Sequence, residues 1–200
     1  LIVYPQQRIT QVPTKKLTLE EIQEDFNILK GALSSDYPSA DRYISKDSVN
    51  SLWKQWERQL KSMDERTFFQ LIGQITHGFH DEHLIPNISQ DFFKNPNRKF
   101  LPFTISVEQK SIWIATVHPS IKNLKKGDQI LSINAHPVST ILSEIKSRMH
   151  HDGYITTFAE RHLEDFSPTQ SFNYFDLWYS ILYEDAAAHF QLNIIREDQP

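Results

Sequence analysis

The stretch from residue 121 to 138, IKNLKKGDQILSINAHPV, constrains the fold of this chain more than any other. A Gly-Asp dipeptide at 127–128 is typical of turns. Apolar and polar side chains then alternate from Gln129 to Asn134, which predicts a short, half-buried strand. A helical pattern follows from Ser139 to Met149. The fold therefore has to place a turn, a strand and a helix in close succession.

Three helical patterns precede this stretch, and apolar residues recur in each of them at three- and four-residue spacing. Each pattern begins after a residue that suits an N-cap, namely Thr18, Ser45 or Asp47, and Asp64. Glu21 completes a capping box with Thr18, so we expect the first helix to run from there to about Leu33. Gly78 is expected to stop the third. The three helices predict a helical domain over residues 18–83.

Residues 84–200 have a different pattern, in which β-rich runs are followed by helices. The runs Phe100–Val107 and Ser111–His118 predict a hairpin. Further segments are expected as two aromatic helices at 155–166 and 170–183 and a closing strand at 188–196. With residues 1–17 as an extended lead-in, the fold class is α+β with domains at 18–83 and 84–200.

Composition excludes several classes of function. The net charge is −4, from 21 Lys and Arg against 25 Asp and Glu, which argues against a nucleic-acid partner. No apolar run reaches the roughly 20 residues of a membrane span. The chain has no Cys, so disulfides, thiolate metal sites and thiol nucleophiles are excluded. Because it begins at Leu1 and ends just after a strand-like segment, we expect it to be a fragment from which a segment such as a signal peptide is missing.

Two histidine-containing segments are candidates for chemistry. His77, His80 and His83 stand beside two carboxylates, but their spacing is not His-Glu-x-x-His and Gly78 interrupts the helix. We interpret this segment as a solvated helix exit and predict no metal or cofactor, keeping these three histidines as the candidate ligands. We interpret His150–Asp152 as a helix C-terminus that favours cationic histidine.

No catalytic constellation is recognisable. The chain has no Gly-x-Ser-x-Gly, and its five glycines are too few for a glycine-rich active-site loop or phosphate cradle. Ser34, Ser35, Ser139 and Thr140 suit turns and helix caps. We therefore predict that the chain is inactive by itself.

The order of the motifs, however, resembles a known family. The segments Asp81–His83, Phe100–Phe103, Lys126–Asn134 and Asp152–Tyr154 follow the capped helices in the same order as in the N-terminal half of tail-specific (C-terminal-processing) serine peptidases. Secreted bacterial members of that family carry a helical leader before a PDZ-like domain. Glu82 departs from the family, which often has Gly there. In that family the catalytic nucleophile and base lie in a following α/β domain, so the resemblance assigns no catalytic residue to this chain.

The resemblance implies a non-catalytic part of a secreted or periplasmic peptidase. Such a part would bind unstructured polypeptide ends or extended peptides and present them to a catalytic domain beyond residue 200. A PDZ-like domain adds the peptide to a sheet edge and captures its carboxylate with backbone N–H groups. The groove would be formed by one loop and strand with the following helix, through Phe100, Leu101, Pro102, Phe103, Thr104, Ile105, Ile141 and Ile145.

Two alternatives remain open. The bulky residues of the loop would fill the core instead of lining a pocket, and Pro102 lacks the N–H that a carboxylate cradle uses. The chain would then be an interaction or scaffold module with a closed groove and no peptide binding. Its aromatic helices would dock a partner domain through Phe172, Phe175 and Trp178.

Overall fold

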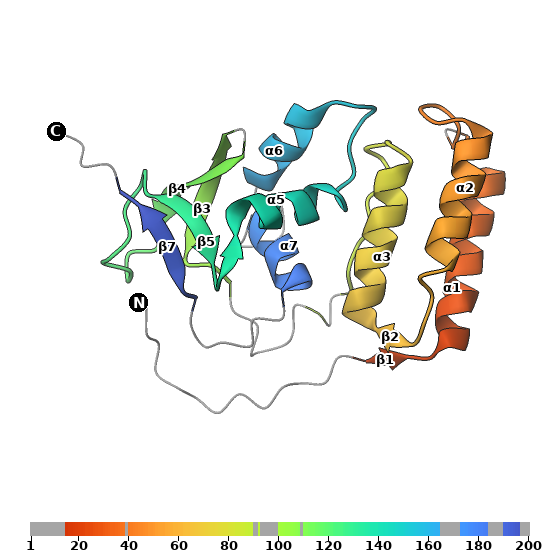
Figure 1. Cartoon of the computed structure of the whole chain (residues 1–200), viewed down its shortest axis with the longest axis horizontal. Helices are drawn as coiled ribbons and strands as arrows, with labels where there is room; N and C mark the ends of the chain where they lie inside the picture. The colour runs from red at the N-terminus through yellow and green to blue at the C-terminus, as the bar shows by residue number, and fades with distance from the viewer. Residues whose placement is uncertain are drawn as a thin grey trace. The chain divides into compact units, whose positions relative to one another are not determined.

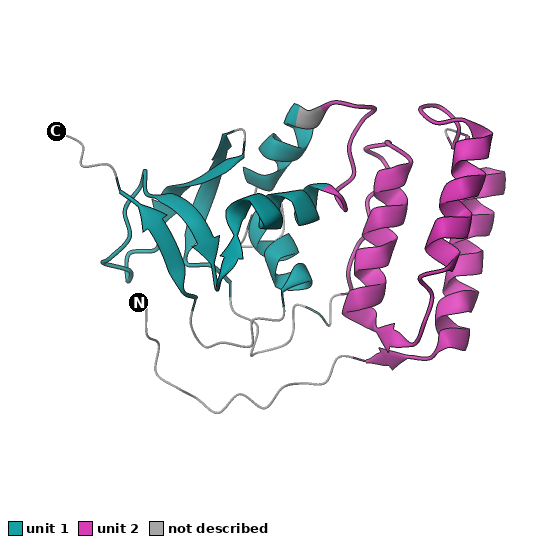
Figure 2. Ribbon diagram, in the orientation of Figure 1, with its two compact units in different colours: residues 1–12, 90–146, 156–200 teal, residues 13–89, 147–155 magenta. Residues whose placement is uncertain are grey.

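The computed structural model describes residues 15–38, 40–89, 92, 100–108, 110–164, 173–183 and 190–196. The chain combines helices with antiparallel strands, which confirms the α+β class (Figure 1). The chain forms two compact units (Figure 2). The helical unit comprises residues 13–89 and 147–155, and the mixed unit comprises residues 1–12, 90–146 and 156–200. The segment 147–155, which the sequence places in the second domain, thus packs with the helices.

The helical unit contains the three expected helices, α1 (Leu19–Gly31), α2 (Lys46–Glu57) and α3 (Glu65–Gly78). Their N-caps are Thr18, Ser45 and Asp64. The capping box is confirmed, because the N–H of Glu21 donates to Thr18 Oγ1 at 3.2 Å and the N–H of Thr18 donates to Glu21 Oε2 at 2.8 Å. After Gly31 the chain continues as a π-helical turn, η1 (Ala32–Asp36). The first helix therefore changes its winding before the predicted end at Leu33.

The start of α3 is tied to the lead-in by a two-stranded sheet. β1 (Lys16–Leu17) pairs antiparallel with β2 (Met63–Asp64), which directly precedes α3. The hydroxyl of Ser62 adds a hydrogen bond to the carbonyl of Leu17 at 2.8 Å. The last two residues of the expected extended lead-in are thus a strand, while residues 1–14 lie outside the described part.

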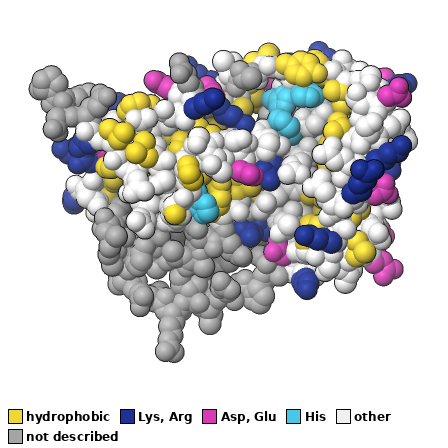
Figure 3. Space-filling view, in the orientation of Figure 1, with side chains coloured by type: hydrophobic (Ala, Val, Ile, Leu, Met, Phe, Trp, Pro, Cys, Tyr) yellow, Lys and Arg dark blue, Asp and Glu magenta, His cyan; other side chains and the backbone are white. Residues whose placement is uncertain are grey.

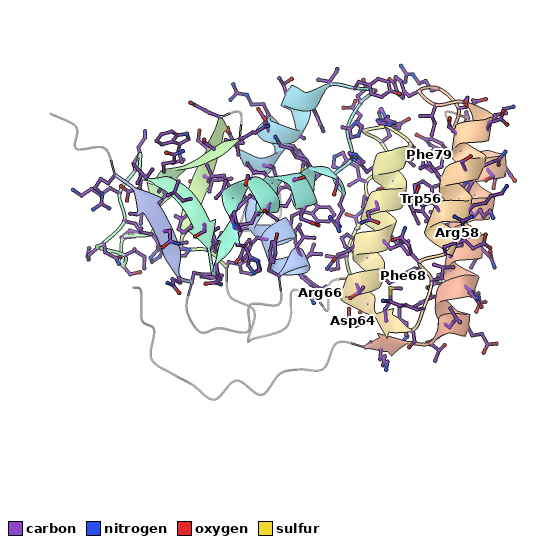
Figure 4. The ribbon with its side chains drawn as sticks, in the orientation of Figure 1. Trp56, Arg58, Asp64, Arg66, Phe68 and Phe79 are labelled. Atoms are coloured by element: carbon purple, nitrogen blue, oxygen red, sulfur yellow. The ribbon has the colours of Figure 1, made fainter. Side chains whose placement is uncertain are left out.

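Aromatic side chains form the core of the helical unit. The ring of Trp53 meets that of Phe26 edge-on at 5.6 Å between centroids. Trp56 stacks on Phe79 at 6.2 Å (Figure 4). α3 ends at Gly78 as predicted, but Gly78 has no left-handed φ. A Cβ built there lies 2.8 Å from Cζ2 of Trp56, so the glycine makes room for an indole ring.

The mixed unit is built on an antiparallel sheet. Its strands are β3 (Phe103–Glu108), β4 (Ser111–Val117), β5 (Gln129–Ile133), β6 (His136–Pro137) and β7 (Leu192–Ile195). The order is β3-β4-β5-β6, and β7 also pairs with β5. The predicted hairpin is confirmed as β3 and β4, although its first strand begins at Phe103.

Hydrogen bonds to Asp128 hold the turn that precedes β5. Gly127 takes a φ of +87°, and the carboxylate of the buried Asp128 accepts the N–H of Lys125 at 2.8 Å. Arg196, just after β7, donates to both oxygens of this carboxylate at 2.7 and 2.6 Å. These bonds hold the pKa of Asp128 below its usual value. The predicted Gly-Asp turn is thereby confirmed.

Three helices complete the mixed unit: α5 (Val138–Lys146), α6 (Thr156–Glu164) and α7 (Tyr174–Leu182). α5 ends three residues before the predicted Met149, and α7 begins after an Asn173 N-cap. Phe175 and Trp178 are buried in the mixed unit, whereas Phe172 lies outside the described residues. In the described ranges no helix combines the length and apolarity that crossing a membrane requires.

Candidate functional site

The outer edge of β3 is the first element of the candidate site. Among the described strands, β3 pairs only with β4. The register moves from Thr104–Thr116 to Ile105–Ile114, so the extra residue of the bulge belongs to β4 and the alternation along β3 is uninterrupted. Alternate residues of an antiparallel strand direct their N–H groups to one edge. Phe103, Ile105 and Val107 therefore share the edge that faces away from β4.

Helix α6 lies along this edge. The carboxylate of Glu164 accepts the N–H of Val107 at 2.6 Å, a position in which an added strand would place a carbonyl oxygen. Leu163, on the same turn, is fully buried. One turn earlier, Glu160 pairs with Lys146 of α5 at 2.7 Å. Thus α6 is bound to β3 on one side and to α5 on the other.

The loop that leads into β3 already holds a carboxyl group. The N–H of Leu101 donates to Oδ1 of Asp176 at 3.0 Å, and both residues are buried. Asp176 is placed by the first turn of α7, where its own N–H donates to the side chain of Asn173 at 2.9 Å. Burial raises the pKa of Asp176 to about 8, and the bond from Leu101 opposes this rise only in part. The Asp176 carboxyl is therefore protonated up to about pH 8.

The structure divides the expected groove residues into two groups. Leu101, Phe103, Ile105, Ile141 and Ile145 are buried in the mixed unit, and Phe100, Pro102 and Thr104 are half-buried. The hydroxyl of Thr104 bonds across the hairpin to Thr116 at 2.7 Å. The apolar side chains of β3 thus face the core. A ligand would reach the N–H of Val107 and those side chains only after α6 moved.

The candidate metal ligands do not come together as a set. His83 is exposed, and its Nδ1 lies 3.0 Å from Oδ1 of Asp81. His77 and His80 instead meet His151, whose ring centroid lies 4.4 and 4.7 Å from theirs. Figure 3 shows histidine side chains gathered on this face of the helical unit. Within the described ranges, no three His, Asp or Glu side chains are arranged to hold a metal ion.

The imidazoles of this cluster are tied to backbone carbonyls. Nδ1 of His77 lies 2.8 Å from the carbonyl of Met149, and Nδ1 of His151 lies 2.8 Å from that of Gly153. The first of these bonds joins the segment 147–155 to α3, and the second lies within that segment. In addition, Gly153 donates its N–H to the carbonyl of His80 at 2.8 Å.

Two interpretations of the histidine segments are wrong. Burial, followed by the proximity of His77, lowers the pKa of His151 to about 4, and burial also lowers the pKa of His77. His150 and His151 are buried and lie beyond α5, which ends at Lys146, so they do not form the end of that helix. Nor is the exit of α3 simply solvated, since His77 packs against the segment 147–155.

Sequence reasoning missed three residues of these sites. Glu164 follows the amphipathic pattern of α6 and reads as an exposed acid. Asp176 stands three residues after Asn173, where an acid near a helix start is ordinary. The sequence presents His151 only as part of a helix C-terminus at His150–Asp152. No local signal identifies their partners, which lie 57 residues away for Glu164 and 75 for Asp176.

Comparison with known proteins places the chain in no family. No protein-family model matches it, and no curated protein matches it. Among solved structures, mature CPAF superimposes with a TM-score of 0.48 and 15% sequence identity, covering 72% of this chain. The chain spans 28% of the length of CPAF. This likeness by itself assigns no activity to the chain.

Proposed function

We propose that this chain is a non-catalytic substrate-recognition part of a secreted or periplasmic serine peptidase, and that it binds extended polypeptide along the outer edge of β3. Its partners are the polypeptide substrate and a catalytic domain beyond residue 200. The order of sequence motifs supports the link to a peptidase. The assignment of the site rests on the bond between Val107 and Glu164. The N–H of Val107 lies on the outer edge of β3, and a side-chain carboxylate stands where the carbonyl oxygen of an added strand would lie.

The proposed binding mode is strand addition. An extended peptide supplies carbonyl oxygens and N–H groups at the two-residue repeat of β3, and backbone hydrogen bonds then give affinity with little dependence on peptide sequence. The alternate side chains of the peptide point toward the layer occupied by α5 and α6. The peptide takes the place of Glu164 on Val107, so α6 has to move aside.

Glu164 competes with the peptide for the N–H of Val107, and the strength of its hydrogen bond sets how much its removal changes peptide affinity. A hydrogen bond to a charged acceptor contributes roughly 1.5–3 kcal/mol. Glu164 is partly exposed, so the lower end of that range applies. Since about 1.4 kcal/mol corresponds to a tenfold change in affinity, removing this carboxylate should tighten peptide binding by about tenfold.

A titration of the whole chain tests the proposal. The probe is a fluorescent peptide of about ten residues, the usual upper length of a strand, with alternating apolar and polar side chains. We expect binding by anisotropy, NMR shifts at the amides of Phe103, Ile105 and Val107, and about tenfold tighter binding by Glu164→Ala. Thr157→Ala, at an exposed position of the same helix, is the matched control and should bind like the wild type.

The closed interaction module remains the second candidate, and the contact of α6 with β3 favours it. In that case the peptide leaves the β3 amides unshifted in both the wild type and Glu164→Ala. Absence of peptide binding in both proteins would refute strand addition.

A further inference from the structure

The loop before β3 decides which part of a polypeptide the site recognises. Capture of a chain end requires several backbone N–H groups that converge on a carboxylate. In the segment Phe100–Phe103, Pro102 has no N–H. The residue before Pro102, Leu101, does have an N–H. The group that accepts this N–H therefore determines what the loop can bind.

That acceptor is internal. Oδ1 of Asp176 receives the N–H of Leu101 at 3.0 Å. Leu101 is 7% exposed and Asp176 is 3% exposed, so the bond is closed to solvent. Asn173, which caps α7, is 2% exposed and fixes the turn that carries Asp176. The loop thus has its carboxyl group supplied by the chain itself, in a packed environment.

Binding the C-terminal carboxylate of a peptide at the loop before β3 would be unfavourable. A peptide carboxylate is ionised at neutral pH, and its transfer to a buried site is costly unless hydrogen-bond donors replace its water. Here one donor is absent and another is bonded to Asp176. Burial keeps the Asp176 carboxyl protonated, which indicates that the surroundings do not stabilise negative charge.

We infer that the outer edge of β3 recognises internal, extended segments of polypeptide and does not require a free C-terminal carboxylate. This inference rests on the proposed function and narrows its substrate class. The chain ends expected from the family resemblance are then one kind of ligand among many, bound through their backbone only.

Three peptides of the same core sequence test the inference on the whole chain. One ends in a free acid, the second in an amide, and the third continues for several residues beyond the core on both sides. We expect dissociation constants within about threefold of one another. We also expect the amide resonance of Leu101 to be unchanged by the free acid, while the amide of Val107 shifts with all three.

The outcomes separate the two levels of the proposal. Binding of the free acid tenfold or more tightly than the amide, with a Leu101 shift specific to the free acid, overturns the inference and leaves strand addition intact. Binding of none of the three peptides, with an unshifted Val107, overturns strand addition and the inference together.

Discussion

Replacing Asp176 by Asn should stabilise the mixed unit at neutral pH. Both side chains offer an oxygen to the N–H of Leu101, but Asn cannot ionise. Burial raises the pKa of Asp176 from 3.8 to about 8. In the unfolded chain the carboxyl loses its proton near pH 4, whereas in the folded chain it keeps the proton up to about pH 8. The contribution of Asp176 to stability is therefore present below pH 4 and decreases as the pH rises to 8.

The magnitude follows from the pKa difference. Each pKa unit corresponds to about 1.4 kcal/mol, so at pH 7, about three units above the unfolded value, the wild type is less stable than a neutral isostere by up to about 4 kcal/mol. Asp176→Asn should equal the wild type at pH 4 and exceed it increasingly up to pH 8. We would measure urea unfolding between these pH values through NMR signals of β4 and β5, which report on the mixed unit.

Asp128 is the matched control, because it is equally buried in the same unit but its pKa is lowered by Arg196. The stability that its charge supplies is present above its usual pKa and is lost as the pH falls through its folded pKa. Asp128→Asn should therefore destabilise the unit by a nearly constant amount, about 1–3 kcal/mol, between pH 4 and 8. If Asp176→Asn and the wild type had parallel pH profiles, the reasoning about Asp176 would be refuted.

Further substitutions test the packing at two glycines, the turn after β5 and the pH dependence that His151 causes. Gly78→Ala brings a methyl group against Trp56 and should lower the unfolding free energy by about 1–2 kcal/mol. Gly31→Ala has open space at its Cβ and should raise the unfolding free energy by up to about 1 kcal/mol. Thermal melts that rank the two variants in the reverse order would contradict the packing argument. Ala135→Gly relieves a φ of +67° in the β5–β6 turn and should stabilise by about 0.5–1 kcal/mol in urea unfolding, so a loss of stability would count against strain there. The lowered pKa of His151 predicts that stability falls by about 2 kcal/mol as the pH drops from 6.5 to 4. His151→Gln should flatten that decline and His118→Gln, at an exposed position, should not; equal declines in acid unfolding would exclude His151 as the cause.

The sequence determined the parts of this protein whose hydrogen bonds close within a few residues. The side chains of Thr18 and Glu21 each bond the other residue's backbone N–H across one helical turn, so four residues of sequence predict the start of α1. The turn at Gly127 and Asp128 closes over three residues in the same way. The spacing of apolar side chains added the helices and the hairpin, because burial on one face repeats with the period of the element.

Only the tertiary structure decided how these elements meet at the candidate site. Gly78 reads as a helix stop, but it is required by an indole ring from α2. Glu164 and Asp176 read as ordinary helix acids, yet each accepts a backbone N–H from a distant segment. The physical reason is that a buried N–H takes the acceptor that folding brings within reach, and chain separation places no limit on that choice. The bonded N–H of Val107 on β3 and the bonded N–H of Leu101 in the loop before it are consequences of that long-range pairing.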